Sequence, residues 1–430
     1  MTSEEKKPET TISGPINVVR LEGEVFGIKK VLYVFFDIHN PPGNESYCEN
    51  IFSDTITTYL INQFRKTNNE YLDFFLEHAP SKLLPNPKNK IIYRGIYLQE
   101  LRKLLSQAFM YDPKEDKVFP SKVFPHVRLH YIDVRDYLFW NILFDQSESV
   151  HSEFMKIYTD LLFSFRPHEN AITQFQENLN NFADKINLIL NLFFGQKGGK
   201  QQKRTTIKQI NEEISEEELH EHALKLIQKI KEKYVHPEVK KVILLMLHEF
   251  FEKGLLVILD KINKVNELLK DLSKLLEINY DEVNPSKPIY DEFTNLPKFI
   301  QMSPWNYGPN YNIIKKIALN ISLLVESMHE IATGSSIIIV DTYFLRRFLD
   351  KDYITNGISY TGLSHSTMYI YILTKYFDFR VTHASYSKYN VDELNNVIKK
   401  TNIGYEFGML FLPSKMYQCS NITDFPDGFS

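Results

Sequence analysis

The first residues in this chain that could do chemistry come at the end of an apolar run near the N-terminus. Residues 31–36 lead directly into Asp37-Ile38-His39. Two residues apart in strict β geometry, Asp37 and His39 face the same way. A carboxylate and an imidazole that converge on one point can bind a divalent metal ion or act as acid and base. The structural alternative, that Asp37 caps the next turn and His39 lies at the rim of the core, stays open on spacing alone.

A second candidate set lies more than three hundred residues further along the chain. Residues 358–361 predict a strand, the sequence GLSH at 362–365 a tight turn, and residues 366–376 a helix. Glycine lets the backbone turn sharply, and the free N–H groups at a helix N-terminus carry partial positive charge. His365 is then either a ligand or a solvent-facing histidine. In a turn at the start of a helix, its imidazole is expected to contribute little to core burial.

Further polar residues follow or interrupt two predicted strands between these sets. Glu77 follows residues 71–76 and is either the solvent end of that strand or a ligand at the sheet edge. Arg128 lies in the strand predicted at 127–132, which is unusually rich in polar residues. The structural interpretation of this region is an ion pair between Asp133 and Arg135, or between strands, at the end of the sheet.

Arginines also lie just upstream of the second set. Arg346 and Arg347 fall in a predicted helical turn at 344–349, where either could point at the same edge while the other is a solvated surface charge. His383 ends the last predicted strand and is more typical of the edge of a core. The chain has no G-x-S-x-G, P-loop, G-x-G-x-x-G or H-E-x-x-H motif, so a serine-hydrolase interpretation is rejected.

These residues belong to a chain that divides into zones. Residues 1–14 are expected to form a disordered leader, 15–145 the first half of an α/β core, 146–330 a helical insertion and 331–430 the second half of the core. Within the insertion, the Gly-rich basic stretch 195–206 predicts a flexible surface loop, with a nucleic-acid contact as the alternative. The expected fold class is α/β, a mostly parallel sheet flanked by helices and split by a large all-helical insertion.

The predicted strands of the core alternate with helices, which is typical of parallel βαβ units. In open α/β sheets, ligands bind outside the carboxyl ends of the strands. We therefore expect His39, Glu77 and His365 to meet at one sheet edge. The expected strands that carry or flank them are residues 18–21, 23–26, 31–37, 71–76, 127–132, 336–341, 358–361 and 379–383.

Composition restricts the possible partners. The formal net charge of −4 gives no global field that favours nucleic acid or an anionic membrane. Two cysteines rule out a disulfide scaffold and favour a reducing compartment, and the polar N-terminus has no signal-peptide core. Residues 242–258 come closest to a membrane span but carry charges, so no span is expected. The expected location is intracellular, in the host cytoplasm or the virion if the protein is viral.

The order of these motifs resembles the TraB/Tiki superfamily and its wider ChaN-like and erythromycin-esterase-like relatives. Members carry G-x-x-H or G-E-x-H after the first strand, Glu after the second, an Arg-containing helix and a final G-x-x-H. Gly362 and His365 match the final motif, whereas Phe36 stands where the first motif has glycine. The composition, the long insertion and the basic loop also resemble uncharacterised proteins of nucleocytoplasmic large DNA viruses.

The resemblance implies several activities, because Tiki-like members are divalent-metal peptidases, erythromycin-esterase-like members hydrolyse esters and ChaN-like members bind haem. The leading hypothesis is a metal-dependent hydrolase of peptide or ester bonds, with an unknown substrate. In it, His39, Glu77 and His365 hold a divalent metal ion or position water, and Asp37 acts as an orienting group or base. Arg128, Arg346 or Arg347 would stabilise developing negative charge. The competing hypothesis is a non-enzymatic viral or host-interaction protein with a degenerate site.

Overall fold

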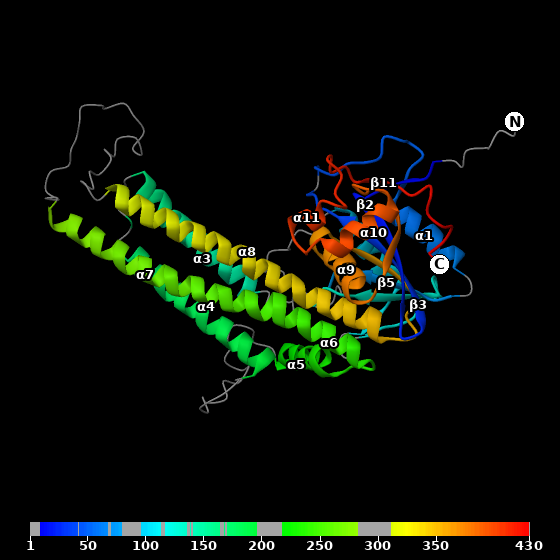
Figure 1. Cartoon of the computed structure of the whole chain (residues 1–430), viewed down its shortest axis with the longest axis horizontal. Coiled ribbons are helices and arrows are strands. Elements are labelled where there is room, and N and C mark those ends of the chain that lie inside the picture. Colours follow the sequence, from blue (N-terminus) through cyan, green and yellow to red (C-terminus); the bar gives the residue numbers. More distant parts are fainter. Residues whose placement is uncertain are drawn as a thin grey trace. The chain divides into compact units, whose positions relative to one another are not determined.

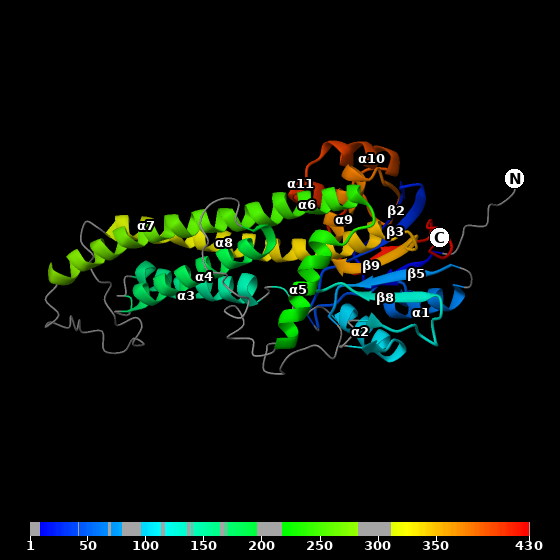
Figure 2. The same cartoon turned by 90° about the horizontal axis from the view of Figure 1, so that it is seen from below.

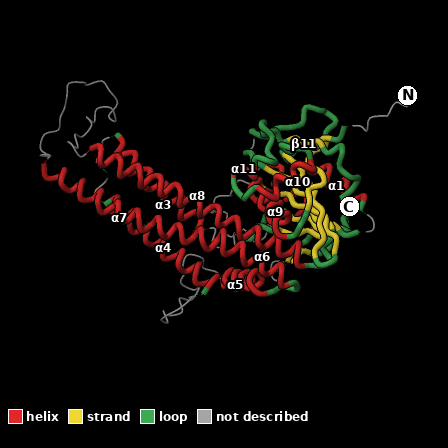
Figure 3. The backbone as a smooth tube through the Cα atoms, viewed as in Figure 1, coloured by secondary structure: helices red, strands yellow, loops and turns green. Residues whose placement is uncertain are grey.

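The computed structural model describes most of the chain (Figures 1 and 3). The described residues are 9–41, 43–67, 70–79, 96–112, 117–135, 138, 141–163, 167, 170–195, 217–282 and 311–429. The chain divides into two compact units. The first comprises Met1–Asp136, Glu232–Leu244 and Ile339–Ser430, and the second comprises Tyr137–Lys231 and Leu245–Ile338.

The first unit is built on a six-stranded mixed sheet with the order β10-β2-β3-β9-β5-β8. Strands β3, β9, β5 and β8 pair in parallel, while β2 is antiparallel to both of its neighbours. The sheet's strands are β2 (Asn17–Val25), β3 (Ile28–Asp37), β5 (Leu72–Leu76), β8 (Val127–Tyr131), β9 (Asn356–Gly362) and β10 (Arg380–Ala384). The α/β class expected from the sequence is confirmed at this level.

A tight turn explains why β2 is antiparallel. Phe26 and Gly27 connect β2 to β3 with φ angles of 53° and 79°. Two successive residues with positive φ form the hairpin turn whose twist matches that of the flanking strands. The two short strands expected at 18–21 and 23–26 are therefore one strand, which continues through Gly23.

Helices cover both faces of this sheet. Helices α1 (Ile56–Lys66) and α2 (Ile96–Ala108) pack on one face, where Phe35, Phe74 and Tyr360 are buried with them in one apolar cluster. Figure 2 shows α9 (Leu363–Tyr376) and α10 (Val391–Lys400) on the opposite face. Because successive residues of a strand point to opposite faces, each strand contributes side chains to the core on both sides of the sheet.

Smaller elements complete the first unit. Strands β1 (Thr11–Ser13), β4 (Asp54–Thr55) and β11 (Cys419–Asn421) form a three-stranded sheet, so residues 11–13 of the expected leader are a strand. The remaining elements are the hairpin β6 (Tyr111–Asp112) and β7 (Lys117–Val118), helix α11 (Tyr405–Gly408) and most of α6 (Pro237–Met246).

The second unit is helical over its described residues. Helix α4 (Ala171–Phe194) packs against both α3 (Gln146–Leu162) and α7 (Lys253–Glu282), as Figure 1 shows. Its buried residues recur three or four positions apart, which puts them on one face of the helix. The unit also contains most of α5 (Glu217–Glu232), the π-helices Asn141–Asp145 and Leu247–Glu252, and the first part of α8 (Tyr311–Asp350). Apart from Gly195, the flexible loop expected at 195–206 lies outside the described residues.

Helix α8 corrects one expectation from the sequence. Residues 336–341, expected to be a strand, lie in the middle of this 40-residue helix. A short apolar run with β-branched residues does not by its period distinguish a strand from a buried helix segment. Helix α8 is also long and apolar enough to cross a membrane, with 44% of its most apolar window buried. A core helix passes the same test, so α8 is not a clear membrane span.

Candidate active site

The carboxyl ends of three parallel strands bring the separated motifs to one edge of the sheet. In the register of β3 with β9, Asp37 pairs with Gly362, the last residues of the two strands. Strand β5 pairs with the other side of β9 and ends at Leu76, so Glu77 emerges beside Gly362. The sheet topology thus places side chains from the first and last hundred residues next to each other.

The side chains form a continuous chain of contacts centred on Glu77. His39 Nε2 lies 3.5 Å from Glu77 Oε2, and His365 Nε2 lies 3.1 Å from Glu77 Oε1. Each imidazole is held from its other side by an aspartate. Asp37 Oδ2 is 2.6 Å from His39 Nδ1, and Asp341 Oδ1 is 2.6 Å from His365 Nδ1. We name these five residues, Asp37, His39, Glu77, His365 and Asp341, the Glu77 cluster.

The two halves of the Glu77 cluster come from opposite faces of the sheet. Asp37 follows Tyr33 and Phe35 on the face covered by α1 and α2, and it lies near the buried hydroxyl of Tyr360. Asp341 belongs to α8, which packs on the other face, near the buried hydroxyl of Tyr369 on α9. The cluster therefore crosses the end of the sheet from one helical layer to the other.

Each end of the cluster carries a buried aspartate beside a buried tyrosine hydroxyl. Tyr360 interacts with Asp37 at one end, and Tyr369 interacts with Asp341 at the other. Burial, reinforced by the nearby aspartate, raises the pKa of each of these tyrosines well above its ordinary value.

Glu77 accepts two further hydrogen bonds besides its contacts with the imidazoles. Arg135 donates to Oε1 over 2.8 Å, and the backbone N–H of Gly362 donates to Oε2 over 2.5 Å. Arg135 is itself held by Asp133, as the structural interpretation of these two residues expected, and it also reaches the cluster. The Glu77 carboxylate therefore contacts four nitrogen atoms, two from imidazoles, one from Arg135 and one from the backbone of Gly362.

The electrostatics of the cluster favour protons on both imidazoles. Burial lowers the pKa of His39, but hydrogen bonds and charge from Asp37 and Glu77 outweigh it and raise the pKa to about 10. For His365, burial is likewise outweighed by Glu77 and Asp341, and the pKa rises to about 9. Burial alone would raise the pKa of Glu77, but the two imidazoles hold it well below its usual range.

His39 differs from the rest of the cluster in exposure and backbone conformation. Its side chain is 28% exposed, whereas those of Asp37, Glu77 and His365 are at most 3% exposed. It also adopts a φ of 50°, a left-handed conformation that side chains rarely take and that is often found at active sites. His39 is therefore the member of the cluster that solvent, and any substrate, can reach.

Gly362 is required by the closeness of these groups. A Cβ atom at this position would lie 2.8 Å from His39 Nε2 and 3.2 Å from Glu77 Oε2. Its φ of −59° is open to any residue, so space and not backbone conformation requires glycine here. Phe36, at the position where the resembling family has glycine, is fully buried, and its ring lies 6.2 Å from that of Phe411.

The structure places the predicted residues differently from one another. Asp37, His39, Glu77 and His365 converge, and His365 is 3% exposed, so the expectation that it contributes little burial is wrong. Helix α9 begins at Leu363, which puts His365 in the first helical turn and not in a loop before it. Its burial follows from the contact with Asp341 on the neighbouring helix.

Arg128 and Arg346 lie elsewhere. Arg128 makes two hydrogen bonds to the buried Asp73 and lies between the rings of Tyr71 and Tyr353. Arg346 donates to the backbone carbonyl of Lys233 just after α5. Neither guanidinium contacts the Glu77 cluster. Arg128 is bound to Asp73, which lies on β5 four residues before Glu77, and Arg346 lies more than one helical turn beyond Asp341.

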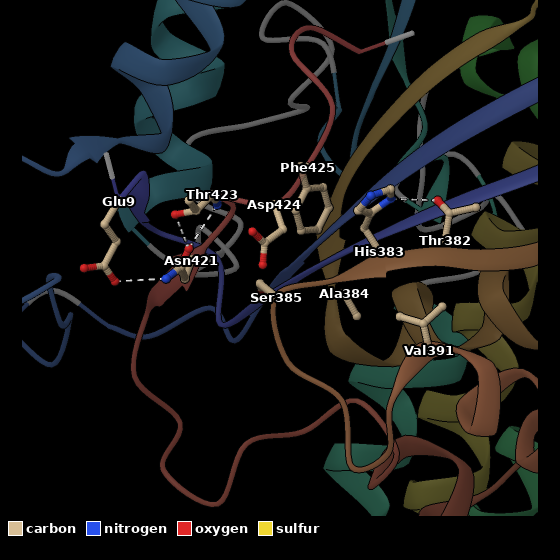
Figure 4. Close-up of a pocket in the computed structure, with 10 residues that line it drawn as sticks. All are labelled: Glu9, Thr382, His383, Ala384, Ser385, Val391, Asn421, Thr423, Asp424 and Phe425. Carbon is tan, nitrogen blue, oxygen red and sulfur yellow. Dashed lines mark hydrogen bonds between the residues drawn. The ribbon is translucent and has the colours of Figure 1, made fainter. Parts of the chain in front are cut away.

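Arg347 and His383 are also separate from the cluster. Burial lowers the pKa of His130 to about 4, and the nearby charge of Arg347 adds to this effect. The Nε atom of Arg347 is buried and has no hydrogen bond. His383 lines a different cavity of about 470 Å³ with Asp424 and Phe425 from the C-terminal segment (Figure 4). Its Nδ1 contacts the Thr382 hydroxyl.

Sequence reasoning missed Asp341 and underused Arg135. Asp341 was assigned to the end of a strand, where no partner for His365 was expected, although it is the one carboxylate within the apolar run SSIIIVDTYF. A lone acidic residue inside an otherwise buried helix is the signal that could have identified it, because buried carboxylates are nearly always paired.

Comparisons with known proteins place the chain in a family. Residues 10–430 match the model of a family of unknown function, DUF5847. The uncharacterized protein R706 of Acanthamoeba polyphaga mimivirus is 34% identical over 432 residues, with 97% of this chain and 96% of the relative covered. Protein R161 of the same virus is 31% identical over 445 residues, covering 97% of this chain and 98% of the relative.

These relatives confirm the resemblance to proteins of a giant virus. They give no support to the resemblance to the TraB/Tiki superfamily. No solved structure matches the chain. Because the family model covers nearly the whole length and the relatives align end to end, the chain belongs to the DUF5847 family.

Proposed function

We propose that the chain is a hydrolase of ester or peptide bonds whose reaction centre is the Glu77 cluster. One observation carries the proposal: two imidazoles, each oriented at Nδ1 by a buried aspartate, direct Nε2 at the same carboxylate. A histidine fixed in this way by a carboxylate is the usual arrangement of a catalytic acid and base. Burying two imidazoles and three carboxylates together costs free energy, which their tight pairing offsets only in part.

His39 is the proposed acid and base, because it is the exposed member of the cluster. In its neutral form, Nε2 would take a proton from the attacking water and then deliver it to the leaving oxygen or nitrogen. Asp37 would hold the tautomer in which Nδ1 carries its proton. Glu77, His365 and Arg135 would orient His39, and Arg135 would supply the positive charge near the site that the sequence assigned to Arg128, Arg346 or Arg347.

A divalent metal ion is the alternative form of this proposal, and the experiment below tests it. In its favour, each imidazole is oriented at Nδ1 by an aspartate, as in histidine ligands of metal sites, and both Nε2 atoms face the same carboxylate. Against it, Glu77 already accepts bonds from Arg135 and from Gly362 N, which a metal ion would have to displace or repel. Within the described ranges, no group of three His, Cys, Asp or Glu residues has the geometry to hold a metal ion.

The resemblance to the TraB/Tiki superfamily and its wider relatives, which include peptidases and esterases, is part of this proposal. It rests on the motif residues Gly362 and His365. The competing proposal is a non-enzymatic viral or host-interaction protein that keeps the cluster for stability alone. The partial exposure of His39 and its left-handed backbone favour the enzyme, because a purely structural network needs neither.

The test is hydrolysis of chromogenic esters and a peptide library by the purified full-length protein, with elemental analysis of bound metal. His39→Asn should lower kcat/KM by about 10²-fold or more, as loss of a general acid or base does. His383→Asn, at the separate cavity, is the matched control and should leave hydrolysis unchanged. Stoichiometric metal lost in His39→Asn would establish the metal-dependent form. Absence of turnover on the whole panel would favour the non-enzymatic protein. Equal activity of both variants would refute the Glu77 cluster as the reaction centre.

A further inference from the structure

The loop that carries His39 is clamped by the C-terminal segment of the chain. Residues 38–53 connect β3 of the large sheet to β4 of the small sheet. The buried side chain of Gln418 accepts hydrogen bonds from Asn40 Nδ2 and from Ser46 N, and its own N–H donates to Ser46 Oγ. Gln418, the residue just before β11, thus ties both ends of the segment 40–46 to the C-terminal segment.

A disulfide fixes the same loop next to that clamp. Cys48 is bonded to Cys419, across 371 residues of sequence, although the sequence favoured a reducing compartment. Cys419 pairs with Ser13 in the small sheet, and Ser13 Oγ accepts from the N–H of Cys48. Both cysteines are partly exposed, so a small reductant can reach the bond.

His39 is the residue that this clamp positions. It begins the loop in a left-handed conformation with φ of 50°, which persists only when the surrounding structure imposes it. Asn40, the next residue, is the first that Gln418 holds. Beyond Asn40, the anchors of the loop before β4 include Gln418, the disulfide, and the bond from the Tyr97 hydroxyl to Ser46 O.

We propose that the Cys48–Cys419 disulfide is a redox-controlled clamp that holds His39 in register with Asp37 and Glu77, so that the oxidised protein has the assembled site and the reduced protein does not. A dithiol reductant supplies two electrons and two protons, the S–S bond becomes two thiols, and the reductant becomes a disulfide. The loop then keeps only its hydrogen bonds, among them those to Gln418, while β11 stays paired with β1. The consequence for catalysis rests on the proposed function, but the placement of His39 does not.

The test compares oxidised and reduced full-length protein by hydrogen exchange and by NMR titration of His39. On reduction, amides of residues 40–50 should exchange about tenfold faster or more, as in local opening, while those of β3 and β9 keep their rates. The pKa of His39 should fall from about 10 toward its ordinary value, because the contacts with Asp37 and Glu77 loosen. Cys48→Ser and Cys419→Ser in oxidising buffer should each reproduce the reduced state, and Gln418→Ala should reproduce part of it.

Three results would overturn the redox clamp. One is unchanged exchange and an unchanged His39 pKa on reduction. Another is faster exchange of the loop with an unchanged His39 pKa. The third is loss of protection throughout β3 and β9, which would make the disulfide a staple of the whole unit. Because these readouts need no substrate, a protein without hydrolase activity can still pass or fail this test.

Discussion

Gly362→Ala is the sharpest single test of the site, because it adds one methyl group and changes little else. Gly362 has a φ of −59° and ψ of 157°, which alanine adopts without strain. The added Cβ would lie 2.8 Å from His39 Nε2 and 3.2 Å from Glu77 Oε2. Ordinary contact begins near 3.4 Å, so the imidazole has to move by about 0.6 Å and the carboxylate by about 0.2 Å.

The expected consequences follow from that displacement. Overpacking at a rigid buried site typically costs about 1–3 kcal/mol, and we expect the free energy of unfolding to fall by this amount. The 3.5 Å contact between His39 and Glu77 should lengthen, so the pKa of His39 should fall from about 10. If the cluster is catalytic, a misplacement approaching 1 Å should lower kcat/KM by up to about 10²-fold.

The assay combines chemical unfolding, NMR titration of His39 and hydrolysis by the two proteins. Gly334→Ala is the matched control, because it lies in α8 with nothing within 4 Å of its added Cβ. That variant should be slightly stabilised, by about 0.5–1 kcal/mol, since alanine replaces glycine inside a helix. A Gly362→Ala protein as stable as this control, with an unshifted His39 pKa, would refute the close-packed cluster.

Three further predictions concern charge. Activity that depends on neutral His39 should rise with pH through the neutral range and level off near pH 10, so a rate that falls over pH 7–9 would contradict its role as a base. The raised pKa values of His39 and His365 contribute stability that is complete below about pH 6.5 and is lost toward pH 9–10, at about 1.4 kcal/mol per pH unit for each imidazole. The lowered pKa of His130 has the opposite effect, because the stability it contributes is lost as the pH falls from 6.5 toward 4. Unfolding curves should therefore show the greatest contribution from these three histidines near pH 6.5, and a monotonic rise of stability to pH 9 would oppose this. Asp341→Asn keeps an acceptor for His365 but removes its charge, so the pKa of His365 should fall and unfolding should become easier by about 1–3 kcal/mol, and an unchanged His365 titration would exclude the contact.

Local pattern was sufficient for most of the first unit's elements and for four of the five members of the cluster. Apolar runs that end in a polar residue identified β3, β5 and β9, and the carboxyl-end rule for parallel strands predicted that His39, Glu77 and His365 would lie at one edge. That reasoning succeeds because strand length, β-branched content and the positions of Gly and polar residues are local properties of the sequence.

Tertiary structure decided which partners these residues have. Residues 336–341 have the composition of a strand but lie within the continuous helix α8, from which Asp341 contacts His365. Local sequence also does not show that Arg135, and not Arg128, contacts Glu77. Arg128 is instead hydrogen-bonded to Asp73 on the neighbouring strand.

The sequence by itself determined the residue types that meet at the edge of the sheet, because strand ends and their polar residues are encoded next to each other. Only the tertiary structure decided how they are held: the burial of His365, the pairing of Cys48 with Cys419 and the saturation of Glu77. Each of these depends on contacts between segments that are tens to hundreds of residues apart. Such contacts follow from the packing of whole layers, and no local window of sequence contains them.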